Sequence, residues 1–181
     1  MANPAKAPVD LGLEEQIKLG GRNRRIEVNY TDLTDTASTS KTLVVDAYQA
    51  RDIIRNACFD RVTSFDGPSI TSVVFKFGWN GASVDDDNGL IESSEVCDAG
   101  TEILAGGGRV NNSTVDSTFA QAEADVLNSL RALYEGLQAQ EAGNLELVVT
   151  SSGANLSVLT AGRLLIYYSK LRLNDVALRA Q

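Results

Sequence analysis

The chain has 181 residues, no histidine and a formal net charge of −8. Without histidine, a Ser–His–Asp triad and a histidine-bearing zinc site are excluded, and the negative charge argues against a main role in binding nucleic acid. No apolar stretch approaches the ~20 residues of a membrane-spanning helix. The mix of 43% hydrophobic and 22% charged residues is that of a soluble globular protein with one domain.

Residues 1–23 combine two prolines and three glycines with few large apolar side chains, and they end beside Arg22, Arg24 and Arg25. Such a segment buries too little apolar surface to fold alone, so we expect an extended N-terminal arm that is disordered or lies along a partner. The arginines could bind an acidic surface; the alternative is a solvated loop before the first strand. The start of the chain does not fit a secretory signal peptide, which favours synthesis in a reducing cytoplasm.

The sequence of the first part of the domain predicts strands joined by loops. Alternating apolar and polar residues predict a strand over residues 24–33. The small polar residues TDTASTS at 34–40 predict an exposed, flexible loop, and the run KTLVVD at 41–46 predicts a second strand. The pattern at 48–58 fits either a short helix or a strand.

The middle of the chain begins with a clear turn. FDGP at 65–68 has turn chemistry, and the β-branched and aromatic residues at 70–79 predict a strand after it. DDDNG at 85–89 is expected to be a solvated acidic loop, with a structural cation bound by Asp85–Asp87 as the alternative, although their spacing does not fit an EF-hand. The glycines at 106–108 are expected to be flexible or left-handed.

One segment has helical periodicity. Apolar residues recur every three or four positions near 119–141, Thr118 and Gln121 fit a capping box, and Gly143 fits a C-cap. We therefore predict an amphipathic helix near 119–141, packed on the sheet or alternatively on another chain. Its apolar stripe consists of Phe119, Ala122, Val126, Leu130, Leu133 and Leu137.

Two more strands are predicted near the C-terminus. LELVVTS at 145–151 and RLLIYYSKL at 163–171 flank a tract with glycines and an asparagine, which predicts a long β-hairpin whose broad loop faces outward. The elements together predict a mainly β chain, α+β by content. Its expected architecture is an antiparallel β-sandwich over 24–175, with a jelly roll as one strand order open to it, followed by a C-terminal tail at 176–181.

No group of residues is typical of an active site. Cys58 and Cys97 are too far apart to form a zinc ligand pair by spacing, and we expect buried thiols, with a disulfide as the alternative. The tract AGGGRV at 105–110 lacks the lysine and the hydroxyl residue of a phosphate loop. Asn29 and Asn112 begin glycosylation triplets that occur often by chance. We assign no catalytic, cofactor-binding or metal-binding residue and expect a protein that is not an enzyme.

Four motifs carry a resemblance to a known class of proteins. They are FDGPSITSVVFKFGWNG, DDDNGL, VCDAGTEILAGG and NLELVVTSSGANLSVLTAGRLLIYYSKL, and they span roughly residues 62–171. This series resembles a pattern in structural proteins of tailed bacteriophages: FDG before a strand that ends in glycine, an Asp-rich loop, an AGT step and a terminal hairpin with stGaNL and LTaG. The resemblance implies a β-sandwich virion protein without catalytic residues. The arm and the predicted helix are not part of the pattern, and we expect them to mark contacts with neighbours.

The resemblance implies a capsid decoration (cement) protein on the outside of the phage head, made in the bacterial cytoplasm. The expected partners are the major capsid protein and further copies of the chain in a homotrimer, with neither nucleic acid nor membrane, and the arm at 1–23 would act as a clamp. The alternative is a tail, collar or fibre-base module for assembly or host recognition. A third interpretation, a carboxylate hydrolase of cell-surface sugars, needs a pair of acids that the sequence does not identify.

Overall fold

The computed structural model describes residues 6–19, 21–81, 85–95, 109–111, 137–138 and 142–172. In chain order, the elements in these residues are β1 (Val9–Asp10), α1 (Leu13–Lys18), β2 (Arg24–Asn29), η1 (Tyr30–Asp32), β3 (Ser40–Tyr48), β4 (Asp52–Asp66), β5 (Ser72–Gly81), β6 (Asp85–Glu95), β7 (Arg109–Asn111), β8 (Leu137–Gln138), β9 (Gly143–Ser152), η3 (Leu156–Val158) and β10 (Ala161–Arg172). The η elements are 3-10 turns.

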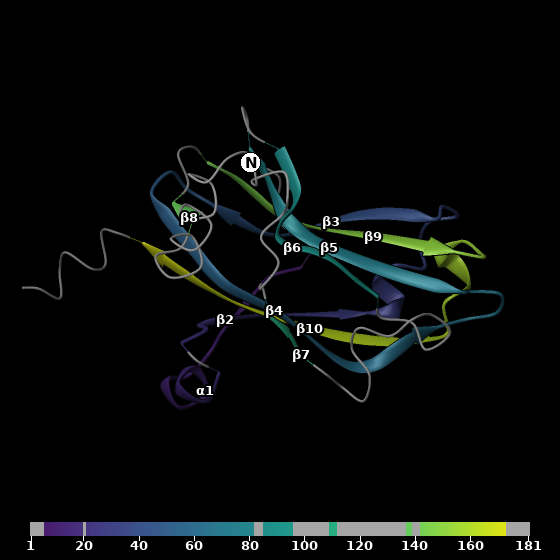
Figure 1. The fold of residues 1–181 in the computed structure, drawn as a ribbon, viewed down its shortest axis with the longest axis horizontal. Helices are drawn as coiled ribbons and strands as arrows, with labels where there is room; N and C mark the ends of the chain where they lie inside the picture. Colours follow the sequence, from purple (N-terminus) through teal and green to yellow (C-terminus); the bar gives the residue numbers. More distant parts are fainter. Residues whose placement is uncertain are drawn as a thin grey trace, which may run out of the picture.

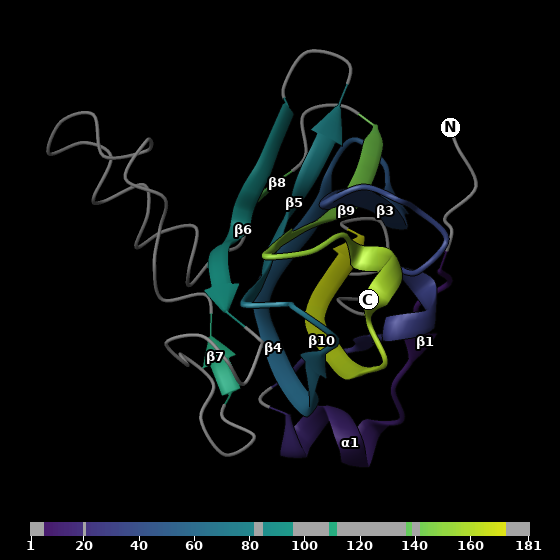
Figure 2. The ribbon, with the colours of Figure 1, turned by 90° about the vertical axis from the view of Figure 1, so that its right-hand side faces the viewer.

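The strands form two antiparallel sheets that pack face to face (Figures 1 and 2). Sheet A has the order β1-β2-β10-β4-β7, with β8 also paired to β4, and sheet B has the order β3-β9-β5-β6. The core lies between the sheets, and the predicted β-sandwich is confirmed at this level. Every other residue of a strand faces the partner sheet, which is why alternation in the sequence located the strands.

Aromatic side chains from both sheets meet in the core. Phe59 of β4 lies edge-on to Phe75 of β5, with ring centroids 6.3 Å apart, and the Phe65 ring lies 4.9 Å from Phe75. Phe77 of β5 lies 5.8 Å from the ring of Tyr168 of β10. All five are fully buried. Such contacts stabilise a core beyond the area that they bury.

Strand pairing follows one pattern through the domain. Strand β5 pairs with β6, β4 with β7, β3 with β9, and β2 with β10. The chain therefore pairs like one long antiparallel hairpin that turns back between β5 and β6. Because the strands before that turn alternate between the sheets, their partners alternate as well.

The predicted hairpin at 145–171 is wrong for this reason. Strands β9 and β10 have the predicted positions, but they belong to different sheets, and residues 153–160 cross from one sheet to the other. Each of these strands lies between two neighbours inside its own sheet, so neither is available to pair with the other. Packed sheets lie about 10 Å apart, a gap that an eight-residue connection spans easily.

Other local predictions had mixed outcomes. The strand expected at 24–33 ends at Asn29, because a 3-10 turn follows in which Asp32 accepts a hydrogen bond from Asn29 N–H over 2.7 Å. Residues 48–58 contain the end of β3 and the start of β4, so the strand interpretation is correct and the helix is wrong. The turn between them is closed by a hydrogen bond of 3.1 Å from Asp52 N–H to Gln49 O.

Most of the predicted helix near 119–141 lies outside the described residues. Only residues 137–138 are described, and they form β8, which pairs with Ile53 and Ile54 of β4. A helix that continues through these two positions is therefore wrong, because their backbone is paired with a sheet edge. The glycines at 106–108 and the tail at 176–181 also lie outside the described residues.

The N-terminal arm at 1–23 was expected to be extended, but residues 9–19 contain β1 and α1 and lie on the sandwich itself (Figure 1). Leu11 is buried there together with Cys58 and Tyr167. Tyr167 lies on the opposite face of β10 from the core residues Ile166 and Tyr168, so this small cluster covers the outer face of sheet A. The free energy that orders the segment comes from this apolar contact and from pairing with β2.

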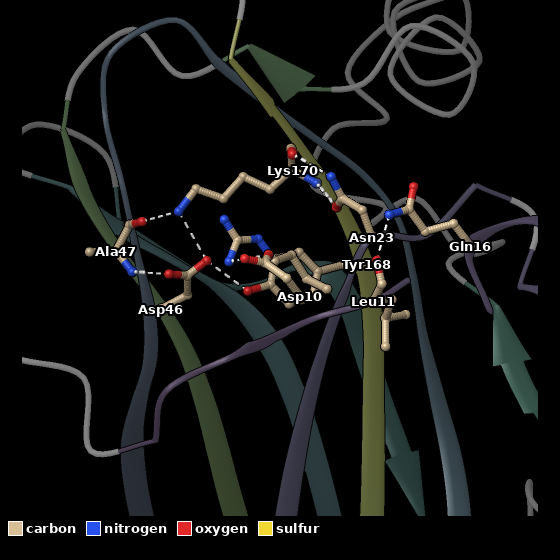
Figure 3. Close-up of polar contacts among 9 residues, drawn as sticks. Asp10, Leu11, Gln16, Asn23, Asp46, Ala47, Tyr168 and Lys170 are labelled. Atoms are coloured by element: carbon tan, nitrogen blue, oxygen red, sulfur yellow. Dashed lines mark hydrogen bonds and ion pairs between the residues drawn. The ribbon is translucent and has the colours of Figure 1, made fainter. Parts of the chain in front are cut away.

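A buried charged cluster connects the two sheets (Figure 3). The hydroxyl of Tyr168 donates a hydrogen bond to Asp46 Oδ2 over 2.7 Å, and Lys170 Nζ lies 3.0 Å from the same oxygen. Lys170 Nζ also donates to the carbonyl oxygen of Ala47, and the Ala47 N–H donates to Asp46 Oδ1 over 2.8 Å. We call Asp46, Tyr168 and Lys170 the inter-sheet clamp, because they join β3 of sheet B to β10 of sheet A.

Burial controls the chemistry of the inter-sheet clamp. The side chains of Lys170 and Asp46 are only 7% and 11% exposed. Burial raises the pKa of Tyr168 far above its ordinary value, and the negative charge of Asp46 raises it further, so the phenol keeps its proton and acts as a donor. A buried charge that loses its partner is costly, so the three side chains depend on one another.

A β-bulge in β3 aims Asp46 into the interior. Val44 and Asp46 pair with neighbouring residues of β9, so Val45 is an extra residue in the strand. Leu43 and the bulged Val45 are buried, and beyond the bulge the buried positions are Asp46 and Tyr48. Without the extra residue, strict alternation would place Asp46 on the solvent face.

We predict that Lys170→Met destabilises the fold by about 3–5 kcal/mol, because it leaves the Asp46 carboxylate buried without its cation. The measurement is urea unfolding at neutral pH, followed by the fluorescence of Trp79. The matched control is Arg163→Met, which breaks the half-exposed Arg163–Glu27 pair (45% and 38% exposed) and should cost less than about 1 kcal/mol. Equal, small losses for both variants would show that the inter-sheet clamp does not hold the sheets together.

Candidate functional site

Three connections between the sheets meet at one end of the sandwich, on the right in Figure 1 and facing the viewer in Figure 2. They are residues 30–39 between β2 and β3, residues 67–71 between β4 and β5, and residues 153–160 between β9 and β10. We call these three connections the loop end. Segments that are far apart in the sequence thus form one continuous surface.

Backbone hydrogen bonds tie the three connections to one another and to the strand ends. Donors and acceptors come from different connections or their flanking strands, so each loop restrains the next. The bonds run from the N–H groups of Leu156, Thr160 and Thr71 to the carbonyl oxygens of Ser38, Asp66 and Ser152, over 2.9, 2.9 and 3.0 Å.

Apolar side chains close the core beneath the loop end. Leu33, Leu156 and Leu159 come from two of the connections and are 0%, 0% and 3% exposed, and Ile70 of the third is 5% exposed. All four belong to the main core cluster. The prediction of a broad outward-facing loop at 152–162 is therefore wrong for its leucines, because their burial compensates for bending the chain across the end of the sandwich.

Glycine allows the FDG and LTAG motifs to interlock. A Cβ at Gly67 would lie 2.4 Å from the carbonyl oxygen of Val158. Gly162 has φ +138°, and a Cβ there would lie 2.3 Å from the ring of Phe65. Both contacts are shorter than any side chain tolerates, so the motifs can pack together only with glycine at these positions.

The outward surface of the loop end is polar and mostly uncharged. Exposed hydroxyl and amide side chains include Ser38, Thr39, Asn155, Ser157 and Thr160. Such side chains form hydrogen bonds in many geometries, which is why they are common on surfaces that bind other proteins. Because the backbone beneath them is already ordered, binding would cost little further conformational entropy.

The predicted loop at 85–89 lies elsewhere and is not a loop. Residues 85–89 belong to β6, and Asp85 and Asp86 pair with Asn80 and Trp79 of β5. Strand β5 ends at Gly81 and β6 already begins at Asp85, so backbone pairing with β5 overrides the low strand propensity of aspartate. Strand β6 starts at the end of the sandwich opposite the loop end. DDDNG therefore lies apart from the predicted loops at 34–40 and between β9 and β10, which belong to the loop end.

Other predicted sites can be placed in part. Cys58 is buried under Leu11, whereas Cys97 lies outside the described residues, so the choice between thiols and a disulfide stays a prediction. The side chains of Asp85–Asp87 are also outside them, and elsewhere in the described part no group of three or more Cys, Asp or Glu side chains could hold a metal ion. None of the described helices is long and apolar enough to cross a membrane.

The sequence contains an indication of the inter-sheet clamp, although none of the sites predicted from it includes Asp46, Tyr168 or Lys170. Leu164, Ile166 and Tyr168 are buried core residues on one face of β10, and Lys170 continues the same alternation. A lysine at an inward position predicts a buried anionic partner. The identity of that partner could not be read from the sequence, because Asp46 turns inward only through the bulge.

Comparison of the chain with protein-family models, with curated proteins and with solved structures finds no match. The residues of the loop end, the motifs that form it and the arrangement of the strands are the features that bear on function.

We predict that Gly162→Ala destabilises the fold by about 2–4 kcal/mol, because it adds both backbone strain and a clash with Phe65. The matched control is Gly12→Ala, where no atom lies within 4 Å of the added Cβ; this change should stay within about 0.5 kcal/mol. Urea unfolding measures both values. A loss for Gly162→Ala no larger than that of its control would show that the two motifs are not locked together.

Proposed function

We propose that the chain is a non-enzymatic structural protein of a tailed-bacteriophage virion and that it decorates the outside of the head as a cement protein. The observation that carries the proposal is the contact between FDG and LTAG. Gly67 and Gly162 bring these two motifs of the resemblance together at the loop end, although about 95 residues of chain separate them. The resemblance thus concerns residues that build one three-dimensional unit.

We further propose that the sandwich is a jelly roll. Support comes from the strand order: β2-β10-β4-β7 in one sheet and β3-β9-β5-β6 in the other are what a long antiparallel hairpin produces when it is wound into two sheets. Viral capsid domains use this architecture, but so do lectins and cupins. Because a fold does not select a function, the motifs and not the fold favour the virion.

In this proposal the loop end docks on the shell. Its polar, ordered surface would form hydrogen bonds with the major capsid protein, and many copies on one shell would add their weak contacts together. A homotrimer would place three loop ends on one local three-fold position, which raises the total affinity without requiring a strong single site.

A tail, collar or fibre-base module is the alternative, because the same loop end could bind a neighbouring tail protein or a host receptor. Copy number separates the two roles. A cement protein is present in hundreds of copies per particle, whereas a tail component is present in a small multiple of three, six or twelve.

The test is co-sedimentation of the purified chain with expanded, undecorated shells of the major capsid protein from the same genome. We predict saturation at one copy per capsid subunit or one trimer per local three-fold position. Ser157→Glu at the loop end should weaken binding at least tenfold, because the exposed serine would become a charge inside the contact. Ala50→Glu, an exposed position in the turn between β3 and β4 at the opposite end, should bind like the parent.

Absence of binding to shells would refute the cement role and leave the tail role to be judged by copy number in purified particles. Binding that Ser157→Glu leaves unchanged would keep the cement role but refute the loop end as the docking surface. Both variants should first be shown to unfold at the same urea concentration as the parent.

A further inference from the structure

The N-terminal segment lies along the open edge of the sandwich, where an edge strand of each sheet ends. Val9 and Asp10 pair with Arg25 and Arg24 of β2. Further towards the N-terminus, Lys6 reaches the other sheet: its backbone nitrogen lies 3.4 Å from the carbonyl oxygen of Val44 in β3, and its Nζ lies 2.7 Å from Asp32. The segment thus acts as an added strand that covers the seam between β2 and β3.

Short backbone pairing, ion pairs and one buried side chain hold this segment in place. Besides the Lys6–Asp32 pair, Asp10 lies 2.7 Å from Arg24 and Glu15 lies 3.9 Å from Arg25. Strand β1 has only two residue pairs, and Leu11 is the one residue of 6–19 that is buried among those described. Leu11 packs with Cys58 and Tyr167 in a cluster separate from the main core. A sheet edge covered by so short a strand remains a site for strand addition.

Helix α1 exposes apolar side chains that the single chain leaves uncovered. Leu13 and Ile17 are 74% and 73% exposed and, four residues apart, share one face of the helix. No residue of α1 is buried. A six-residue helix is far below the roughly 12–15 residues that an isolated helix needs in water, so α1 requires a packing partner.

The segment joins the sandwich through a glycine pivot. Gly21 has φ +83°, and a Cβ added there would meet no atom within 4 Å. Two residues later, Asn23 is fixed to β10 by three hydrogen bonds with Tyr168 and Lys170 (Figure 3). Residues after Gly21 are therefore anchored to β10, and the positive φ of Gly21 sets the direction in which residues 6–19 leave it.

We propose that residues 6–19 are exchanged between copies of this chain, so that the segment of one copy adds to the β2 edge of the next and places its Leu11 beside the neighbour's Cys58. Exchange replaces each contact by an identical one, so it costs little free energy. It also places α1 between two sandwiches, where Leu13 and Ile17 can be covered. The strand that covers the β2 edge of one copy then belongs to a second copy, whether or not the protein binds shells.

The experiment is a disulfide trap in the full chain. Leu11→Cys is introduced with Cys97→Ser, so that Cys58 is the one remaining native thiol. The purified protein is oxidised mildly and run on a denaturing gel without reductant. Exchange predicts covalent dimers and larger species that disappear on reduction. The matched control is Lys18→Cys in the same background, because Lys18 is 69% exposed and lies on another face of α1 from Leu13 and Ile17, so it should cross-link several-fold less.

Covalent oligomers that exceed those of the Lys18→Cys control support exchange, and light scattering of the unoxidised protein should show the same number of copies. A cross-link confined within single chains overturns the proposal, because the segment then stays on its own sandwich. No cross-link, or one equal to the control, also overturns it, because Leu11 is then not beside any Cys58.

Discussion

The buried carboxylate of Asp46 is the constraint on which the arrangement of the two sheets depends. A charge removed from water must be matched by donors, and Asp46 receives them from the Tyr168 hydroxyl, from Lys170 and from the N–H of Ala47. Two of these donors lie on β10 and one on β3. Sliding one sheet past the other would separate the charge from its partners, so the cluster selects one alignment in a core that is otherwise apolar and non-directional.

Strand β10 transmits this constraint to the N-terminal segment. The side chains of Tyr168 and Lys170 point to Asp46, whereas the backbone of the same residues binds Asn23, and the Ser169 hydroxyl between them donates to Gly21. The pivot of the segment is therefore set by the strand that joins the sheets. The N-terminal segment therefore leaves the sandwich at a point that β10 fixes.

The loop end is rigid for a different reason. Its order comes from buried leucines and from glycines that allow backbone to pack against backbone and ring. Above this base, Asn155 and Ser157 expose polar side chains. The Ser38 hydroxyl accepts a hydrogen bond from Ser40 N–H, and the Thr160 hydroxyl donates one to Asp66 O. A structural role in a lattice needs surfaces of this kind, in which many ordered copies each contribute a weak contact. Different interactions thus stabilise the two ends of the sandwich. At one end the buried charged cluster joins the sheets, and at the loop end close packing of leucines and glycines holds the connections.

The sequence by itself determined where most strands lie, because the side chains of a strand alternate between core and solvent and leave a local pattern. It also located the turn at FDGP and the polar connections at 34–40 and 153–160. The candidate docking surface was visible only in pieces, since nothing local shows that these connections meet, or that DDDNG belongs to a strand at the other end.

Only the tertiary structure decided the pairing of the strands, the inward turn of Asp46 and the helical form of residues 13–18. Strands β9 and β10 are adjacent in the sequence, yet each pairs with strands more than 60 residues earlier, because the free energy of burial depends on which sheet faces which and not on distance along the chain. The bulge at Val45 changes which residues face inward by one position, and no local pattern records such a shift. Alternation therefore determined the strands, while the burial of the shared core and of one carboxylate decided how they are arranged.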